Sequence, residues 1–296
     1  MQFGLKIVLR GRVVFASGRH YEVETADGRR LRAFPKSRRE AFACGDLVEI
    51  DAHGAVVSMQ PRTSLFYRSD ALREKIIAAN ADQVLVVVAT EPGFDSELAS
   101  RALVAAEHQR LGALVVLNKT DLAARLPEAR AKLAPFACAG YPIVELCALR
   151  DVSPLLPHLA GRTSVLVGGS GAGKSSLVNA LVPGTAARTR EISRALGAGK
   201  HTTTAARFYR LGASGAIIDS PGMQRFGLAH VPAGELAECF PELRTHAGHC
   251  RFRDCRHATE PGCAVLQAVR SGDLSAVRHA HFLALHAELA HALLAR

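Results

Sequence analysis

The stretch Gly168–Ser175 has the residues needed to hold a polyphosphate. It runs G-G-S-G-A-G-K-S, the spacing G-x-x-x-x-G-K-[ST] of a phosphate-binding loop. An apolar run at 164–167 precedes it as a short buried strand, and 176–181 follow as the first turns of a helix. Backbone N–H groups and the helix N-terminus would then face the phosphates. The alternative is a glycine-rich turn without a ligand.

Within this loop, Lys174 is expected to reach the terminal phosphates and Ser175 to hold Mg²⁺. The expected nucleotide-binding residues are Gly168, Gly169, Ser170, Gly171, Ala172, Gly173, Lys174, Ser175 and Ser176.

A second motif, N-K-T-D, occupies Asn118, Lys119, Thr120 and Asp121. It follows the apolar run 113–117, so it sits at the carboxyl end of a strand, where α/β sheets bind ligands. The motif resembles the guanine-recognition motif of GTPases, in which a carboxylate such as Asp121 accepts both the guanine N1–H and the exocyclic amine. These four residues are therefore expected to bind the base of GTP. The strand over 142–147 is expected to end in a loop that backs the base.

The third motif is D-S-P-G, from Asp219 to Gly222, after the apolar residues 216–218. Asp219 fits the carboxylate that meets Mg²⁺ through water, and Gly222 fits the glycine whose N–H senses the γ-phosphate. In an ordinary GTPase the N-K-x-D motif comes last, whereas here it comes first. A sheet with these motifs can still form if the chain is circularly permuted, since termini that lie close together tolerate such a change.

This order of motifs resembles the circularly permuted, ribosome small-subunit-dependent GTPase A family, over nearly the whole chain. The resemblance implies GTP hydrolysis to GDP and phosphate, as a checkpoint in late maturation of the small ribosomal subunit through rRNA binding. It also points to 197–204 as switch I, with one of Thr202, Thr203 and Thr204 as a Mg²⁺ ligand.

Hydrolysis in many small GTPases uses a glutamine directly after the D-x-x-G motif to orient the attacking water. Met223 stands there in this chain and has no suitable donor or acceptor. Slow intrinsic hydrolysis is therefore expected. The family shares the hydrophobic residue and is stimulated by the small ribosomal subunit. His201 and Gln224 are candidates to orient the attacking water in place of the glutamine, and His201 is included in the expected catalytic set with Lys174, Ser175, Asp219 and Gly222.

A compact set of metal-binding residue types lies near the C-terminal end. Cys250, Cys255, His257 and Cys263 form the pattern C-x4-C-x-H-x5-C. Three thiolates and one imidazole make a complete tetrahedral set for a structural zinc ion, without a position for water. Reduced structural cysteines are the alternative. The resembled family has a zinc site with this pattern.

The elements that must position these motifs fall into three predicted domains. Residues 1–61 contain five short strands with turn signals between them, which suits an all-β, OB-like barrel that binds RNA. Residues 62–225 alternate strands and helices as an α/β permuted P-loop GTPase domain. Residues 226–296 are expected to form a mostly helical zinc-binding domain.

Two clusters of positive or titratable side chains allow competing interpretations. The basic cluster in 29–39, without an acidic residue, would contact RNA phosphates or form a solvated loop. Its members are Arg29, Arg30, Arg32, Lys36, Arg38 and Arg39. Helical spacing over 273–294 predicts an amphipathic helix. Its histidines are expected on an exposed face, as solvated surface or RNA contacts, with a second metal site as the alternative. These are His279, His281, His286 and His291.

Bulk composition bounds the partners. The net charge of +10 and the pI near 9.6 suit a polyanion, although solubility alone is an alternative. Seven cysteines without a secretory signal favour thiols or metal over disulfides. No apolar run is long enough to span a membrane, and residues 1–6 lack the apolar segment of a signal peptide, so a cytoplasmic protein is expected. No feature of the sequence indicates an oligomer, so a monomer is expected.

Two other functions remain open at this point. One is an RNA-binding or RNA-chaperone protein in which GTP only sets affinity. The other is a P-loop kinase acting on a small molecule, which the Asn118–Asp121 motif disfavours.

Overall fold

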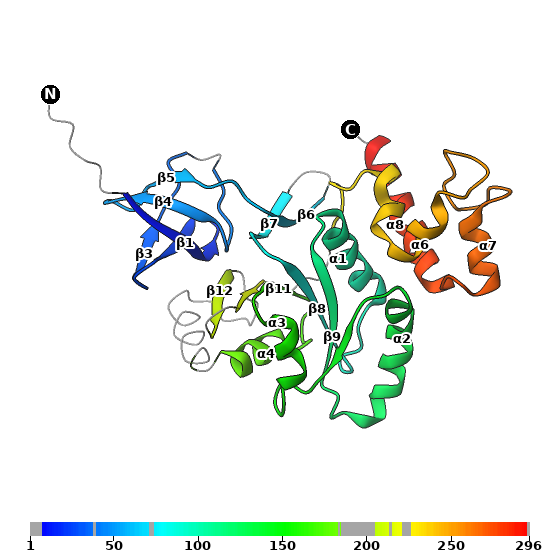
Figure 1. Cartoon of the computed structure of the whole chain (residues 1–296), viewed down its shortest axis with the longest axis horizontal. Helices are drawn as coiled ribbons and strands as arrows, with labels where there is room; N and C mark the ends of the chain where they lie inside the picture. Colours follow the sequence, from blue (N-terminus) through cyan, green and yellow to red (C-terminus); the bar gives the residue numbers. More distant parts are fainter. Residues whose placement is uncertain are drawn as a thin grey trace.

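A computed structural model describes residues 8–37, 40–70, 74–182, 184, 205–212, 215–220 and 226–294, with the side chains of 292–294 left out. Figure 1 shows N-terminal strands at one end, a sheet flanked by helices in the middle and helices at the other end. None of the helices in these ranges is both long and apolar enough to cross a membrane.

A parallel sheet forms the centre of the chain. Its strands follow the order β10-β9-β8-β11-β13, and β12 adds an antiparallel strand beside β13. Continuous apolar runs such as that of β8, every residue of which is buried, are typical of strands covered on both faces. The bounds are β8 Gln83–Ala89, β9 Gly112–Asn118, β10 Ile143–Glu145, β11 Thr163–Val167, β12 Ala206–Leu211 and β13 Gly215–Asp219.

Helices cover both faces of this sheet because alternate strand residues point to opposite sides. Val84, Val86 and Val88 of β8 belong to the core shared with α1 and α2, whereas Leu85 and Val87 belong to the core shared with α3 and α4. The helix bounds are α1 Ser96–His108, α2 Leu126–Cys138, α3 Leu156–Leu159 and α4 Lys174–Leu181. Short 3₁₀ turns lie at Ala123–Arg125 (η1) and Ser153–Leu155 (η2).

The five short strands predicted in residues 1–61 are present. They are β1 Val8–Ser17, β2 His20–Thr25, β3 Arg30–Ala33, β4 Leu47–Asp51 and β5 Val56–Met59. β1 pairs with β2 and β4, β3 with β2, and β5 with β4, all antiparallel. A parallel bridge from Phe34 to Ala55 brings the end of β3 to the start of β5, and these strands enclose their own small core.

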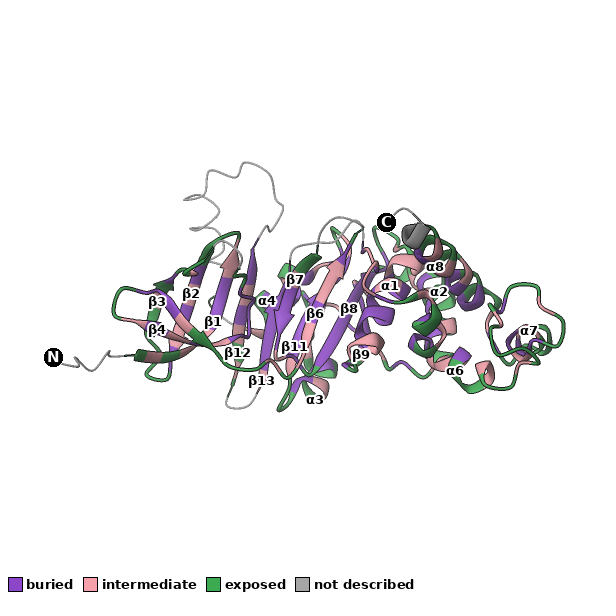
Figure 2. Cartoon of the chain, turned by 90° about the horizontal axis from the view of Figure 1, so that it is seen from above, coloured by how far each residue is buried: buried purple, intermediate pink, exposed green. Residues whose placement is uncertain are grey.

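Two strand pairings were not predicted from the sequence. β1 pairs with β12 through Phe15–Arg207 and Ala16–Ala206, so one sheet path runs from the N-terminal strands into the central sheet. A separate hairpin of β6 (Leu65–Ser69) and β7 (Glu74–Ala79) follows the N-terminal strands, and Ser69 forms a bridge to Leu228. Figure 2 shows buried residues along the strands of this path.

The C-terminal segment is helical, as predicted. Its elements are η3 Ala233–Cys239, α6 Pro241–Ala247, α7 Ala264–Ser271 and α8 Ala276–Leu294. The prediction that the α8 histidines lie on an exposed face is wrong for two of them, because His279 and His281 are buried. His281 lies within hydrogen-bond distance of Ser96 and Ser100, so it faces α1 rather than solvent.

Candidate nucleotide and metal sites

The three nucleotide motifs meet at one edge of the central sheet. Asn118 ends β9 and 119–121 follow it, the loop 168–175 follows β11, and Asp219 ends β13. The adjacent strands in this order, β9-β8-β11-β13, are parallel, so their carboxyl ends lie at the same edge. The expected base-binding and phosphate-binding residues are therefore neighbours in space, although about fifty residues separate them in sequence.

Asn118 is the side chain that holds three parts of this edge together. It is 2% exposed, and its Nδ2 donates to the carbonyl of Ala172 in the phosphate-binding loop at 3.0 Å. Its Oδ1 accepts from the backbone N–H of Lys119 at 2.8 Å and of Ala148 at 2.9 Å. The expected backing loop is thus fixed to the N-K-x-D loop, and both are fixed to the P-loop.

Lys119 and Thr120 extend this frame, and Asp121 stays at the surface. Lys119 donates through Nζ to the carbonyl of Glu91 at 2.6 Å, and its own carbonyl accepts from Thr90 Oγ1. The Thr120 N–H donates to Leu146 at 3.3 Å. Asp121 is exposed, so its carboxylate is accessible to a ligand.

The phosphate-binding loop turns through conformations that need glycine. Gly173 has φ of 91°, and a Cβ there would clash with the Asn118 amide nitrogen. At Gly168 a Cβ would clash with the carbonyl of Val87 on the neighbouring strand. Helix α4 starts directly after Gly173, so its N-terminus lies at this edge, where helices favour anions.

Lys174 and Asp219 form the charged centre of the site. The Lys174 ammonium lies inside the loop and donates to the carbonyls of Gly168 at 2.7 Å and Gly169 at 3.0 Å. Burial lowers the pKa of Lys174, and the charge of Asp219 partly offsets this. Burial also raises the pKa of Asp219 to about 6, against the opposing charges of Lys174 and Arg207. Ser175 is exposed, and Ser176 is half-buried.

Several residues expected at this site lie outside the described residues. These are His201, Gly222, Met223 and Gln224, and the switch I stretch 197–204 with its three threonines. Arg38 and Arg39 of the basic cluster also lie outside.

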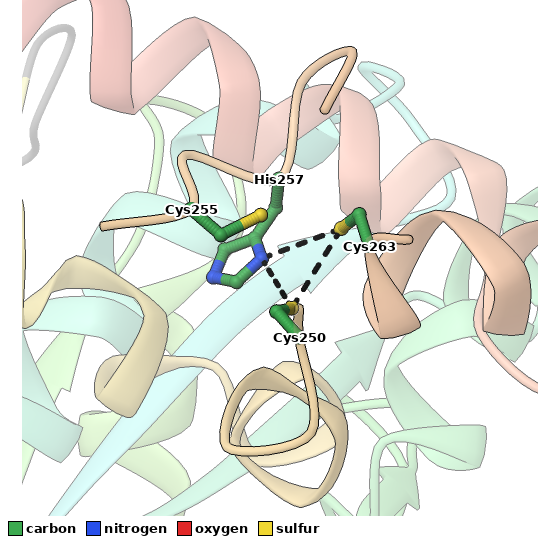
Figure 3. Close-up of side chains that lie close together, drawn as sticks. All are labelled: Cys250, Cys255, His257 and Cys263. Carbon is green, nitrogen blue, oxygen red and sulfur yellow. Dashed lines mark hydrogen bonds between the residues drawn. The ribbon is translucent and has the colours of Figure 1, made fainter. Parts of the chain in front are cut away.

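The four expected metal ligands come together in the C-terminal segment. Their ligand atoms all lie within 4.8 Å of one another (Figure 3). His257 Nδ1 lies 3.5 Å from Cys250 Sγ and 3.6 Å from Cys263 Sγ, and the two sulfurs are 3.8 Å apart. Metal–sulfur bonds of about 2.3 Å and metal–nitrogen bonds of about 2.0 Å in a tetrahedron give edges of about 3.5 to 3.8 Å. The three distances among Cys250, His257 and Cys263 match these edges, and Cys255 Sγ lies within 4.8 Å of the other ligand atoms, so the four residues suit a four-coordinate metal.

Two further residues, which sequence reasoning missed, shape this metal-binding loop. The Glu260 carboxylate accepts from the backbone N–H groups of Arg256, Ala258 and Thr259 at 2.9 to 3.1 Å. Burial opposes its ionisation, but these backbone donors outweigh that effect and lower the pKa of Glu260 to about 2. His279 Nε2 lies 2.7 Å from the carbonyl of His257, which ties the loop to α8.

A parallel sheet with a guanine-type loop, a P-loop and a D-x-P-G aspartate at one edge, in this chain order, defines a circularly permuted P-loop GTPase. The sequence model of the RsgA GTPase family matches residues 59–229. The chain belongs to this family and is a GTP hydrolase.

Relatives and solved structures support the same assignment. The small ribosomal subunit biogenesis GTPase RsgA of Burkholderia pseudomallei (strain K96243) is 48% identical over 291 residues, covering 95% of this chain and 91% of the relative. That of Ralstonia nicotianae is 48% identical over 295 residues, with the same coverage. YjeQ from Thermotoga maritima has a TM-score of 0.73 at 28% identity, covering 96% of this chain and 99% of that chain. YloQ, titled a circularly permuted GTPase, has a TM-score of 0.71 at 24% identity, covering 98% of each chain, and supports the fold.

Proposed function

We propose that the chain hydrolyses GTP as a checkpoint factor in late maturation of the small ribosomal subunit, and that this subunit stimulates its activity. One observation carries the proposal. The Asn118-centred frame joins a guanine-type loop to a P-loop in a chain 48% identical to relatives named small ribosomal subunit biogenesis GTPases. A role at the ribosome would place the protein in the cytoplasm, and we retain the expectation that it acts as a monomer.

In the nucleotide site, Asp121 selects guanine through two donors that adenine does not present. Lys174 and the N–H groups of the P-loop neutralise charge on the γ-phosphate, where stabilisation of the transferring group does most of the catalytic work. Mg²⁺ would be held by Ser175 and, through water, by Asp219, with Gly222 sensing the γ-phosphate. His201 is the proposed residue for orienting the attacking water.

The flanking regions would contact rRNA. The strand pairing β1-β2-β3 and β1-β4-β5, with the β3–β5 bridge, supports an OB-like barrel over 1–61. Arg10 and Arg30 on these strands, and Arg29 in the turn before β3, have exposed side chains. Each is paired with a carboxylate, of Glu49, Glu24 and Asp27 respectively, and would exchange that partner for an RNA phosphate. We propose the same three domains as the sequence predicts: an RNA-binding domain over 1–61, the GTPase domain over 62–225 and the metal-binding domain over 226–296.

The metal in the C-terminal segment would be zinc. Three thiols and one imidazole nitrogen are ligands that zinc prefers, and four protein ligands leave no site for a reacting water. The ion would therefore hold the loop 250–263 in shape rather than take part in hydrolysis.

The test is GTP turnover by the purified protein alone, with isolated small subunits and with isolated large subunits. We expect slow turnover alone and stimulation by the small subunit only. Lys174→Ala should abolish turnover in every condition, which controls for a contaminating GTPase. Addition of excess ATP should leave the rate unchanged because Asp121 excludes adenine.

Stimulation by both subunits, or by neither, would contradict the proposed ribosomal role. Unchanged RNA binding and unchanged subunit maturation by Lys174→Ala would instead favour an RNA-binding protein that uses GTP only to set affinity. Competition by ATP would favour the kinase alternative.

A further inference from the structure

Arg101 on α1 makes an unusual set of contacts close to the nucleotide site. Its side chain is 16% exposed, and all three guanidinium nitrogens donate hydrogen bonds. Nε and Nη2 donate to Glu97 on the same helix at 3.1 and 2.8 Å. Nη1 and Nη2 form a fork on Glu288 of α8, with Nη1 at 3.0 Å from Oε1. Nη1 also donates to the carbonyl of Phe226 at 3.3 Å.

Phe226 is the first described residue after the D-x-P-G motif. Its side chain is 1% exposed and packs against Phe66 of β6, with ring centroids 5.7 Å apart. It also borders a cavity of about 100 Å³ that β8, the loop 92–95, α1 and residues 168–170 of the P-loop line as well. The position of Phe226 is therefore held by Phe66 on one side and by Arg101 on the other.

Both ends of the chain segment that contains Gly222 are attached to fixed elements. At the start, Ser220 Oγ donates to the carbonyl of Leu166 in β11 at 2.6 Å. At the end, Ser69 of β6 donates its N–H to the carbonyl of Gly227 at 3.0 Å and accepts from the Ala229 N–H at 3.1 Å. Arg101 is the side chain that adds a charge-assisted anchor at this end.

We propose that Arg101 is a positioning residue for GTP hydrolysis: through the Phe226 carbonyl it fixes the end of the D-x-P-G segment, and through Glu288 it ties that segment to α8. This proposal deepens the proposed function. It depends on the ribosomal role only for the subunit-stimulated reaction and not for intrinsic GTP turnover. Helix α8 lies beside α1 and carries His279, which contacts the metal-binding loop (Figure 1). Under this proposal, a change in the position of Phe226 would reach α8 through Arg101 and Glu288.

The geometry requires arginine. A planar guanidinium can present separate N–H groups to two carboxylates and a carbonyl at once, whereas a lysine ammonium is a single point on a flexible stem. The two carboxylates also favour the charged form, and the hydrogen bond to Glu288 is the largest contribution that raises the pKa of Arg101.

The test compares Arg101→Gln and Arg101→Lys with the wild type in steady-state GTP hydrolysis. We expect kcat to fall about tenfold in both variants while the KM for GTP stays within about twofold, because the lost anchor acts on the transition state and not on nucleotide binding. Glu288→Gln should cause a smaller fall, of about threefold. The double variant Arg101→Gln with Glu288→Gln should be no worse than Arg101→Gln alone if the two residues act as one unit.

The matched control is Arg130→Gln. Arg130 forms a comparable fork on Glu145, at 2.9 and 2.7 Å, but joins α2 to β10 at the surface. It should leave kcat and KM within about twofold of the wild type. Hydrogen exchange gives a second readout: amides of 226–231 and α8 should differ between GDP and a non-hydrolysable GTP analogue in the wild type and in Arg130→Gln, but not in Arg101→Gln.

An unchanged kcat in Arg101→Gln and Arg101→Lys, with the nucleotide-dependent exchange retained, would overturn the proposal. If Arg101→Gln fails to fold, Glu288→Gln and Arg101→Lys decide the matter by the same two readouts. A wild type that no ribosomal subunit stimulates would contradict the ribosomal role alone, because the Arg101 comparison can be made on intrinsic turnover.

Discussion

Asn118 should matter for nucleotide binding even though the guanine-selecting carboxylate is Asp121. Replacing Asn118 by Ala removes three side-chain hydrogen bonds and leaves the Ala172 carbonyl and the Lys119 and Ala148 N–H groups without this partner. Each such bond contributes about 1 kcal/mol net, so the total cost is about 3 kcal/mol. If all of it falls on the ligand-bound form, nucleotide affinity decreases by about 150-fold.

The experiment is calorimetric titration of Asn118→Ala with GDP, together with denaturant unfolding of the nucleotide-free protein. We expect affinity to fall by about 10- to 100-fold, because part of the cost appears instead as lower stability of the free protein. The reason is that the base-binding loop, the backing loop and the P-loop must be aligned at the same time when the nucleotide binds.

Asn80→Ala is a suitable control for this experiment. Asn80 also makes three side-chain bonds between distant segments, accepting from Thr63 N at 2.8 Å and Thr63 Oγ1 at 3.1 Å and donating to Gly45 at 3.0 Å. It should lower stability and leave GDP affinity unchanged. If Asn118→Ala behaves in the same way as Asn80→Ala, the proposed role of Asn118 as the organiser of the nucleotide loops is wrong.

Three further predictions concern stability and metal binding. Cys255→Ser should reduce bound zinc well below about one ion per chain after dialysis, as measured by atomic absorption, and full retention would argue against the tetrahedral site. Burial, helped by the charge of His108, lowers the pKa of His230 to about 4 from 6.5. The folded state thus favours neutral His230, so the stability that His230 contributes is complete above about pH 6.5 and is lost as the pH falls towards 4. The melting temperature should therefore fall more steeply from pH 7 to 5 in the wild type than in His230→Phe. Equal slopes in the two proteins would refute this. Glu242→Gln should cost about 3 kcal/mol of unfolding free energy, because it weakens the hydrogen bond to the fully buried Arg278 and removes its paired charge. Adding Arg278→Met should restore most of that loss in denaturant unfolding, and no restoration would count against the buried ion pair as the cause.

The placement of the nucleotide motifs at the ends of strands was predictable because each motif follows a short apolar run, which favours a buried strand. The ligand-binding roles of their residues stay predictions. The metal ligands were equally predictable, since four residues of the right types lie within fourteen positions and needed little tertiary information. The four ligands cluster because they lie in one short loop, 250–263, so their spacing in the sequence already limits how far apart they can be.

Contacts between distant segments were not predictable. Arg101 has the pattern of an ordinary surface arginine with an i, i+4 partner, and nothing in the sequence indicates that Glu288 and the Phe226 carbonyl complete its set. The α8 histidines show the same limit. A polar residue type suggested exposure, but hydrogen-bond partners on α1 allow His281 to be buried.

The pairing of β1 with β12 has a practical consequence for preparing fragments of this protein. β12 begins two residues after the 197–204 stretch, and β1 pairs with the edge of β12 that does not face β13. A fragment that starts after residue 61 would leave unpaired the backbone groups on the edge of β12 that faces β1, whereas the other edge would stay paired with β13. It would also uncover Phe208, which Arg12 covers in the full chain. Exposed strand edges of this kind recruit other chains, so such a fragment should self-associate, and its low activity would then measure aggregation and not the role of the N-terminal strands.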